Sequence, residues 1–168
     1  KKWKISINFF EKFYLRSGID KNKRLIFNEY KGPVLDPEKN WVYYYDKGGK
    51  KSQGNYFNDF KYGLWSFWYA NGNKQSEGYY IKDMKNSLWT NWYANKQKRE
   101  FGNYINNKED GEWIYMSENG EKILSGHFYK GKKVKTWNHW YSKTKKKKQV
   151  EYNNGIKISE LCWDKNGN

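Results

Sequence analysis

Aromatic and polar residues alternate on both sides of an Asn-Gly dipeptide in the segment 65–80, which reads WSFWYANGNKQSEGYY. An alternation with a period of two predicts β-strands, and aromatic residues favour strands. Asn-Gly between two such runs is a strong hairpin signal, because a type I′ turn needs positive φ at both central residues. We therefore expect a β-hairpin with a two-residue loop formed by Asn71 and Gly72.

This loop fixes which residues of the two strands face each other. The expected pairs are Trp65–Gly78, Gly63–Tyr80 and Tyr69–Lys74. A large ring opposite a glycine can lie flat over the bare backbone, and the contact compensates the weak strand propensity of glycine. The pattern predicts that contacts of this kind hold the hairpin together.

The same hairpin recurs with a period of 24 residues and without insertions. Four columns follow this spacing, and we expect them to be structural. They are Trp41, Trp65, Trp89, Trp113 and Trp137; Gly54, Gly78, Gly102 and Gly126, with Val150 in the fifth place; Tyr56, Tyr80, Tyr104, Phe128 and Tyr152; and Lys50, Lys74, Lys98, Lys122 and Lys146. A period of this size is typical of repeat arrays.

The period divides the chain into an N-terminal segment, five repeats and a short tail. The expected bounds are 1–40 for a capping segment; 41–64, 65–88, 89–112, 113–136 and 137–160 for the repeats; and 161–168 for a partial repeat. The connections between hairpins are too short for the crossovers that parallel strands need. We therefore predict an all-β fold, an elongated single-layer antiparallel meander of β-hairpins.

Three stretches depart from the regular pattern. Lys96 replaces the turn glycine of the third repeat, so it must take positive φ, at a cost of about 1 kcal/mol, or enlarge the loop. Residues 143–148 have no turn signal, and we expect a longer, mobile loop there. In the N-terminal segment, residues 5–14 fit a strand and a helical turn equally, while 25–30 favours a strand. A capping role is expected for this segment, because repeat arrays need atypical ends.

Composition and charge restrict the class of protein. Only 36% of the residues are hydrophobic, but 21% are aromatic, and each ring can bury about 150–250 Å², which argues against disorder. The net charge of +15 indicates either a solvated lysine surface or a polyanionic partner such as nucleic acid, an anionic membrane or an acidic protein. Only three of the 33 basic residues are arginine, which disfavours base-specific recognition but permits non-specific contact with phosphates.

The single cysteine, Cys162, excludes an intramolecular disulfide and a thiolate zinc cluster. No apolar stretch is long enough to span a bilayer. The chain starts with Lys1 rather than Met, so we expect it to be processed or incomplete, and residues 1–10 resemble a signal segment only faintly. The sequence leaves the compartment open.

Two units, GLWSFWYANGNKQSEGYY (63–80) and GEWIYMSENGEKILSGHF (111–128), resemble MORN repeats. The resemblance is to the variant found in bacterial YwqK-family antitoxins, and it covers about residues 41–160. It implies an elongated, twisted antiparallel sheet that serves as an interaction or scaffold module. The antitoxin label of that family implies a toxin as partner, and contact with phospholipids has been proposed for some MORN arrays.

Side chains alternate across a strand, so each hairpin has two faces. We place all the strictly periodic columns on one face, where a Tyr69–Lys74 cation–π contact would contribute about 0.5–1 kcal/mol. The opposite face has one large apolar residue per hairpin among variable polar neighbours (Lys51, Gln75, Arg99, Ile123 and Lys147). Because Trp, Tyr and Arg dominate interface energies, this pattern predicts a partner-binding stripe. Its candidate residues are Tyr44, Trp68, Trp92, Met116, Trp140 and Arg99. The alternative is that the N-terminal segment or the curvature of the sheet covers these rings.

The lysines of the last hairpin break the repeat pattern. Lys143, Lys145, Lys146, Lys147 and Lys148 form either a site for phosphates or lipid headgroups or a solvated loop. A nucleic-acid interpretation would treat the periodic rings as stacking platforms, but rings at a fixed spacing more often form a core.

The sequence offers little support for catalysis. His127 and His139 are the only histidines, and parity places them on opposite faces. Glu109, Asp110 and Glu112 are common turn chemistry. No phosphate-binding loop, dinucleotide fingerprint or nucleophile elbow is present. We expect no enzyme activity, cofactor, metal or small-molecule substrate.

The sequence therefore predicts a non-catalytic interaction or scaffold module that binds another protein. The first alternative is a basic structural subunit of a large assembly such as a ribonucleoprotein. The second is peripheral binding to an anionic membrane.

Overall fold

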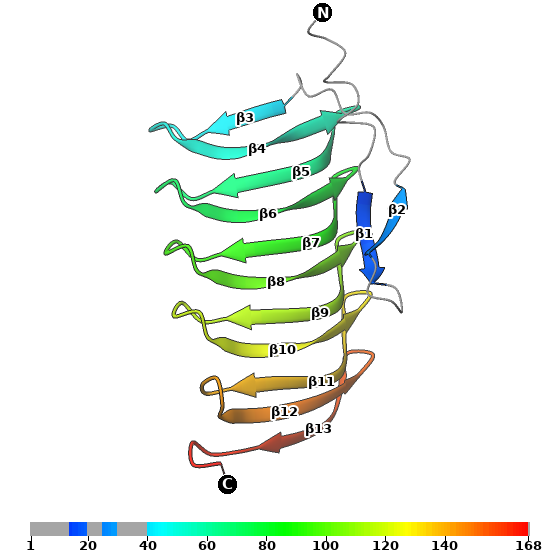
Figure 1. Ribbon diagram of the computed structural model, residues 1–168, viewed down its shortest axis with the longest axis vertical. Helices are drawn as coiled ribbons and strands as arrows, with labels where there is room; N and C mark the ends of the chain where they lie inside the picture. The colour runs from blue at the N-terminus through cyan, green and yellow to red at the C-terminus, as the bar shows by residue number, and fades with distance from the viewer. Residues whose placement is uncertain (1–13, 20–24, 30–39, 168) are drawn as a thin grey trace, which may run out of the picture.

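The computed structural model describes residues 14–19, 25–29 and 40–167 (Figure 1). Eleven strands form one open sheet in the order β13 to β3, and each strand pairs antiparallel with its neighbours in sequence. The strands are β3 (Asn40–Tyr44), β4 (Lys50–Phe57), β5 (Phe60–Trp68), β6 (Lys74–Ile81), β7 (Met84–Trp92), β8 (Lys98–Ile105), β9 (Lys108–Met116), β10 (Lys122–Tyr129), β11 (Lys132–Trp140), β12 (Lys146–Asn153) and β13 (Ile156–Cys162). The predicted all-β, single-layer meander of hairpins is confirmed.

Two further strands, β1 (Tyr14–Ile19) and β2 (Leu25–Glu29), pair antiparallel as a separate two-stranded sheet. β2 occupies the segment for which a strand was favoured. Most of residues 5–14 lie outside the described part of the chain. The capping role of 1–40 stays a prediction.

The hairpin tips lie at one end of the strands, on the left in Figure 1. They contain three-residue loops. The N–H of Tyr69 donates to the carbonyl of Asn73, and the N–H of Gly72 donates to the carbonyl of Tyr69, both at 2.9 Å. Gly72 has a φ of 83°, whereas Asn71 does not take positive φ. The predicted two-residue loop is therefore wrong. The Asn71 side chain accepts the N–H of Asn73 at 3.0 Å, and this local bond favours a type I turn closed by a left-handed glycine.

The tip loop changes the strand pairing beside it. Trp65–Gly78 and Gly63–Tyr80 pair as predicted, but the register then shifts and Lys74 pairs with Trp68. The predicted Tyr69–Lys74 pair is therefore wrong. One extra residue on the second strand, a β-bulge at Gln75, accounts for the shift.

The type I′ turns occur instead at the opposite end of the strands, where the chain passes from one hairpin to the next. Asn58 and Asp59 have φ values of 48° and 64°, and Lys82 and Asp83 have 49° and 61°. Successive return turns are also bonded to each other, since the N–H of Asp83 donates to the carbonyl of Lys61 at 3.1 Å. The short connections between hairpins are thus tight two-residue turns.

The two irregular tips share the outer closing bond of the regular ones. Lys96 takes a φ of 73°, one of its two predicted options. The N–H of Tyr141 donates to the carbonyl of Lys145 at 2.8 Å, with the same spacing as the Tyr69–Asn73 bond. The longer loop predicted for 143–148 is therefore wrong, because tertiary pairing of β11 with β12 sets the loop length without a turn signal.

Buried tryptophans form the centre of the sheet. Trp65, Trp89 and Trp137 are 1% exposed and Trp113 is 2% exposed. A Cβ placed on Gly78 would lie 2.3 Å from the Trp89 ring, so each indole lies on the glycine of the preceding hairpin. The expectation that Trp65 lies over its pairing partner Gly78 is wrong. The strand bends just before each tryptophan, where Gly63, Leu64 and Trp65 face the single residue Gly54, and this bulge directs the ring backwards.

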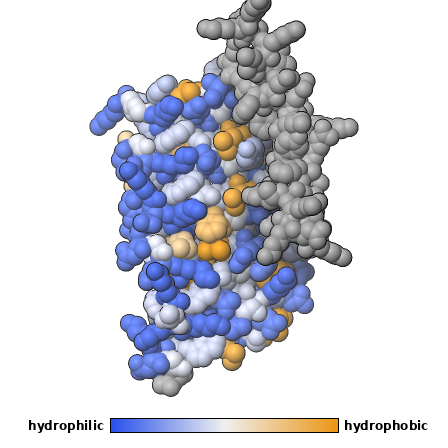
Figure 2. Space-filling view, in the orientation of Figure 1, coloured by the Kyte–Doolittle hydropathy of each residue, from blue (hydrophilic) through white to orange (hydrophobic). Residues whose placement is uncertain are grey.

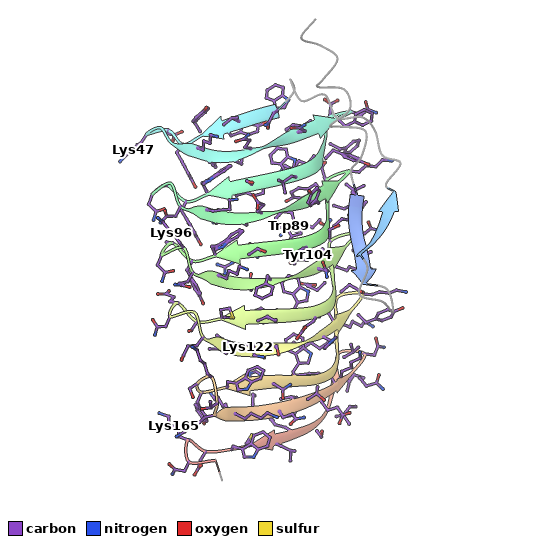
Figure 3. All side chains as sticks on the ribbon, in the orientation of Figure 1. Lys47, Trp89, Lys96, Tyr104, Lys122 and Lys165 are labelled. Atoms are coloured by element: carbon purple, nitrogen blue, oxygen red, sulfur yellow. The ribbon has the colours of Figure 1, made fainter. Side chains whose placement is uncertain are left out.

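Each of these rings is fixed from several sides. Trp89 Nε1 donates to the carbonyl of Tyr79 at 3.1 Å, and the Tyr80 ring packs edge-on at 5.0 Å between centroids. The Lys85 ammonium lies 4.4 Å from the Trp89 ring centroid. Figure 3 labels Trp89 and Tyr104 within the body of the sheet. Trp41 on the edge strand β3 is 54% exposed, which shows how much of the burial comes from the preceding hairpin.

Candidate partner-binding face

The sheet has two chemically different faces. The tryptophan face contains Trp65, Trp89, Trp113 and Trp137. The stripe face contains Tyr44, Trp68, Trp92, Met116 and Trp140. Trp68 is three residues from Trp65 on the same strand, so parity places the two rings on opposite faces, as predicted.

The stripe residues differ in how far solvent reaches them. Tyr44 is 62% exposed, whereas Trp68, Trp92, Met116 and Trp140 are half-buried. Leu64 and Leu88, which lie on the same face, are 45% and 53% exposed. The stripe face therefore leaves apolar surface accessible on several hairpins.

Lysines from the preceding hairpin partly cover the stripe rings. Lys50 lies 5.6 Å from the Trp68 centroid, Lys74 lies 5.7 Å from Trp92, and Lys122 lies 4.3 Å from Trp140. The periodic lysine column therefore contacts the stripe face, and its predicted place beside Trp65 is wrong. The bulge at the tip reverses its side, so Lys74 contacts a stripe tryptophan rather than Tyr69.

Arg99 does not belong to the stripe. Its Nη2 lies 3.2 Å from Glu100 Oε1, and the same oxygen accepts the Asn91 amide at 3.1 Å. Asn91 is two residues from Trp89 and shares its face. The prediction that places Arg99 beside Trp92 is wrong, because in a bulge two consecutive side chains point to the same side.

A polar network on the stripe face holds one of these lysines in place. Glu77 Oε2 accepts the Ser66 hydroxyl at 2.6 Å and lies 2.6 Å from the Lys74 ammonium. Burial acts to raise the pKa of Glu77, but the bonds from Lys74 and Ser66 outweigh it, so the pKa is lowered. The carboxylate therefore stays ionised at neutral pH and fixes Lys74 near Trp92.

The centre of the sheet is the most apolar part of the visible surface. Figure 2 shows apolar residues gathered at the level of β8 and β9, while hydrophilic residues cover the edge of the hairpin tips. Phe101 pairs with Ile114 here, and both are half-buried on the stripe face with Met116. Trp92 and these three residues form the apolar centre of the stripe.

The lysines of 143–148 do not form a single cluster. Lys146 lies 5.8 Å from the Trp163 centroid, Lys147 lies 5.4 Å from Tyr141, and Lys148 pairs with Glu160 at 2.9 Å. Lys143 and Lys145 are exposed in the tip loop. The predicted anion site is therefore divided, because Lys146 belongs to the lysine column of the stripe face whereas Lys148 pairs with His139 on the opposite face. Tip lysines such as Lys47, Lys96 and Lys165 line the side of the hairpin tips (Figure 3).

The other candidate groups stay apart. His127 pairs with Glu112, and His139 pairs with Lys148, on opposite faces of the sheet. In the described residues, no three His, Cys, Asp or Glu side chains come close enough to hold a metal ion. Within the same residues, no helix is long and apolar enough to cross a membrane.

One lysine column over the tryptophan rings was not predicted from the sequence, although its members are spaced by multiples of 24 residues. Lys61, Lys85 and Lys133 lie over the tryptophan-face rings Trp65, Trp89 and Trp137 at 4.8, 4.4 and 4.3 Å. Glu109 takes the corresponding place in the third repeat. Burial lowers the pKa of Lys85, while Glu100 and Glu109 oppose the shift.

Comparison with protein-family models and with curated proteins finds no match to this chain.

Proposed function

We propose that this protein is a non-catalytic interaction module of the MORN type that binds another protein through its stripe face. The observation that supports it best is the row of half-buried rings Trp68, Trp92 and Trp140, each with a lysine ammonium from the preceding hairpin over it. Partly desolvated rings beside fixed cations are typical of interface hot spots.

The dimensions of the stripe suit a protein partner. Neighbouring strands lie about 4.8 Å apart, so successive hairpins are spaced by roughly 10 Å and the five stripe residues span roughly 40 Å. A contact about 20 Å wide along this length would bury about 800 Å² of this chain, which is the usual share in a specific complex.

The resemblance to YwqK-family MORN repeats supports a partner that is a toxin-like protein, held by a scaffold without chemistry of its own. Under this proposal the tryptophan face serves the fold and the stripe face serves recognition. The Trp68–Trp92 step lies beside the Ser66–Glu77–Lys74 network, so we place the energetic centre of the interface there.

The test compares stripe variants with a matched exposed-ring control. Trp68→Ala and Trp92→Ala are expected to abolish capture of a defined protein from the source cell, with and without nuclease treatment. Tyr43→Ala is the control, because Tyr43 is 41% exposed and parity with Trp41 places it on the tryptophan face. A photo-crosslinking residue at position 92, but not at 43, should mark the same protein.

Circular dichroism and thermal unfolding of each variant separate recognition from folding. Equal capture by all variants would contradict the proposal. Capture that disappears after nuclease treatment would favour a ribonucleoprotein subunit. Loss of the folded state in Trp68→Ala would show that the stripe rings are structural.

A further inference from the structure

The lysines of the chain are unevenly distributed along the repeats. From Lys122 to Val150 the sequence contains ten lysines and no aspartate or glutamate. The preceding stretch, 100–121, contains six acidic residues. The positive charge is therefore concentrated on β11 and β12 rather than spread evenly over the array.

The fold brings part of this charge to the tryptophan face. His139 on β11 pairs with Lys148 on β12. Burial and then the charges of Lys148, Lys133 and Lys147 lower the pKa of His139, which places all three ammonium groups within its electrostatic reach. Lys133 is also affected, since burial and the charge of Lys148 lower its pKa.

Three of these lysines lie on the strands of the β11–β12 hairpin and two lie in its tip loop. We define the lysine band as Lys133, Lys148 and Lys147 on the strands, continued by the exposed Lys145 and Lys143 in the loop. β11 has nine residues, so the band extends over roughly 30 Å. Glu160 on β13 accepts from Lys148 and Lys157 and is the carboxylate that faces the band.

Aromatic rings lie between the lysines. The Lys133 ammonium lies 5.2 Å from the Tyr152 centroid, and Lys147 lies 5.4 Å from Tyr141, which is 38% exposed. Lysines alternating with rings along a line suit a strand of phosphates carrying bases, and ammonium groups bind phosphates as point charges.

We propose that the lysine band binds the sugar–phosphate backbone of single-stranded nucleic acid without reading its sequence. The proposal concerns the tryptophan face and stands independently of the protein contact proposed for the stripe face. A single strand repeats its charge at every nucleotide, which matches a linear band better than the isolated carboxylates of an acidic protein.

The probe is a fluorescein-labelled 20-nucleotide oligothymidylate, whose anisotropy is titrated with the full chain between 50 and 200 mM salt. The band variant Lys133→Gln/Lys147→Gln/Lys148→Gln is compared with Lys47→Gln/Lys96→Gln/Lys165→Gln. Both variants remove three positive charges, but only the first removes them from the band. Thermal unfolding confirms that both are folded.

We expect the band variant to bind at least tenfold more weakly at 50 mM salt. Its slope of log affinity against log salt should fall by about two, since each phosphate contact contributes about 0.7 for single strands. The control should stay within about twofold of the wild type. Replacement of Lys133, Lys147 and Lys148 by Arg should preserve binding, because it keeps the charge.

His139 supplies a second readout. The charged groups that face it are Lys133 on its own strand, Lys147 and Lys148 on β12 and Glu160 on β13, while its β10 neighbour is Leu124. Protonation of His139 adds positive charge to the band, so affinity should rise as the pH falls from 7.5 to 5.5. His139→Gln should flatten this dependence.

Three results would overturn the proposal. Equal losses in the band variant and its control would show attraction by net charge alone. Equal displacement of the oligonucleotide by polyglutamate of the same charge concentration would indicate an acidic protein ligand. Band-dependent binding to vesicles with 30% phosphatidylserine, without oligonucleotide binding, would indicate a lipid surface.

Discussion

Replacing Gly78 by alanine tests the contact on which the whole array depends. The added Cβ would lie 2.3 Å from Cδ2 and 2.4 Å from Cε2 of Trp89, where an ordinary contact needs more than 3.4 Å. The ring would have to move by about 1 Å. Its bond to the Tyr79 carbonyl, the Tyr80 ring and the Lys85 ammonium all oppose that movement.

Two opposing effects determine how much Gly78→Ala changes the free energy of unfolding. Overpacking of a tight core costs about 1–3 kcal/mol, and a locked ring belongs at the upper end of that range. Alanine also restricts the unfolded chain, which stabilises by about 0.4–1 kcal/mol. We expect the free energy of unfolding to fall by about 2 kcal/mol, or the melting temperature by about 4–8 °C for a chain of this size.

The assay is urea unfolding followed by far-ultraviolet circular dichroism, with hydrogen exchange to locate the loosened hairpin, because repeat arrays can unfold in parts. A double-mutant cycle provides the control. In a Trp89→Ala background the clash is absent, so Gly78→Ala should cost nothing there. The same cost in both backgrounds, or no cost in the wild type, would refute the argument from ring packing.

Two further predictions concern backbone strain and buried phenols. Lys96→Gly should stabilise the protein by about 1 kcal/mol in urea unfolding, because Lys96 holds a φ of 73° that glycine adopts without strain; an unchanged midpoint would show that the tip is not strained. Burial, followed by Glu109 and Glu100, raises the pKa of Tyr104 to about 12. Since the pKa is higher folded than unfolded, the stabilisation is complete below pH 10 and is lost as the pH rises from 10 to 12. Stability measured from pH 9 to 11.5 should fall less steeply in Tyr104→Phe, and equal slopes would argue against it.

The body of the sheet was predictable from sequence because its determinants are periodic. The 24-residue columns set the register, and a two-residue alternation set the faces of Trp65 and Trp68. These features depend on the spacing and the size of the side chains, and both can be read from the amino-acid sequence. The fold class and the central pairs were therefore predicted correctly.

The hairpin tips were mispredicted because a bond to the next hairpin, together with a local side-chain bond, selects the loop type. Asn73 donates its side-chain amide to the Ala94 carbonyl of the next hairpin at 2.7 Å, while Asn71 accepts the Asn73 N–H. These bonds stabilise a three-residue loop over the type I′ turn that Asn-Gly favours in isolation. The resulting bulge moves Lys74 and Arg99 to the opposite sides from those predicted, so the candidate site was only partly placed.

The side-chain hydrogen bonds between successive hairpin tips could not be predicted from the sequence either. The hydroxyls of Tyr45, Tyr69 and Tyr93 donate to the carbonyls of Trp68, Trp92 and Met116 at 2.6, 2.8 and 2.9 Å. Each bond joins residues 23 apart, so it would appear in the sequence only as one more aromatic position before a turn. Geometry alone shows that these phenols tie each tip to the next.

The contact between a tryptophan and the preceding glycine gives the array a direction. Every internal unit offers a flat glycine to the unit that follows and inserts an indole into the unit that precedes it. Any such unit is therefore interchangeable with its neighbours, and copying or deleting one in register preserves both halves of the joint. Val150 ends the series, because a buried branched side chain, 2% exposed, stands where the other units have glycine. Gain and loss of repeats is thus compatible with the joint up to β11, and the length of the stripe face can change in steps of roughly 10 Å without redesign of its chemistry.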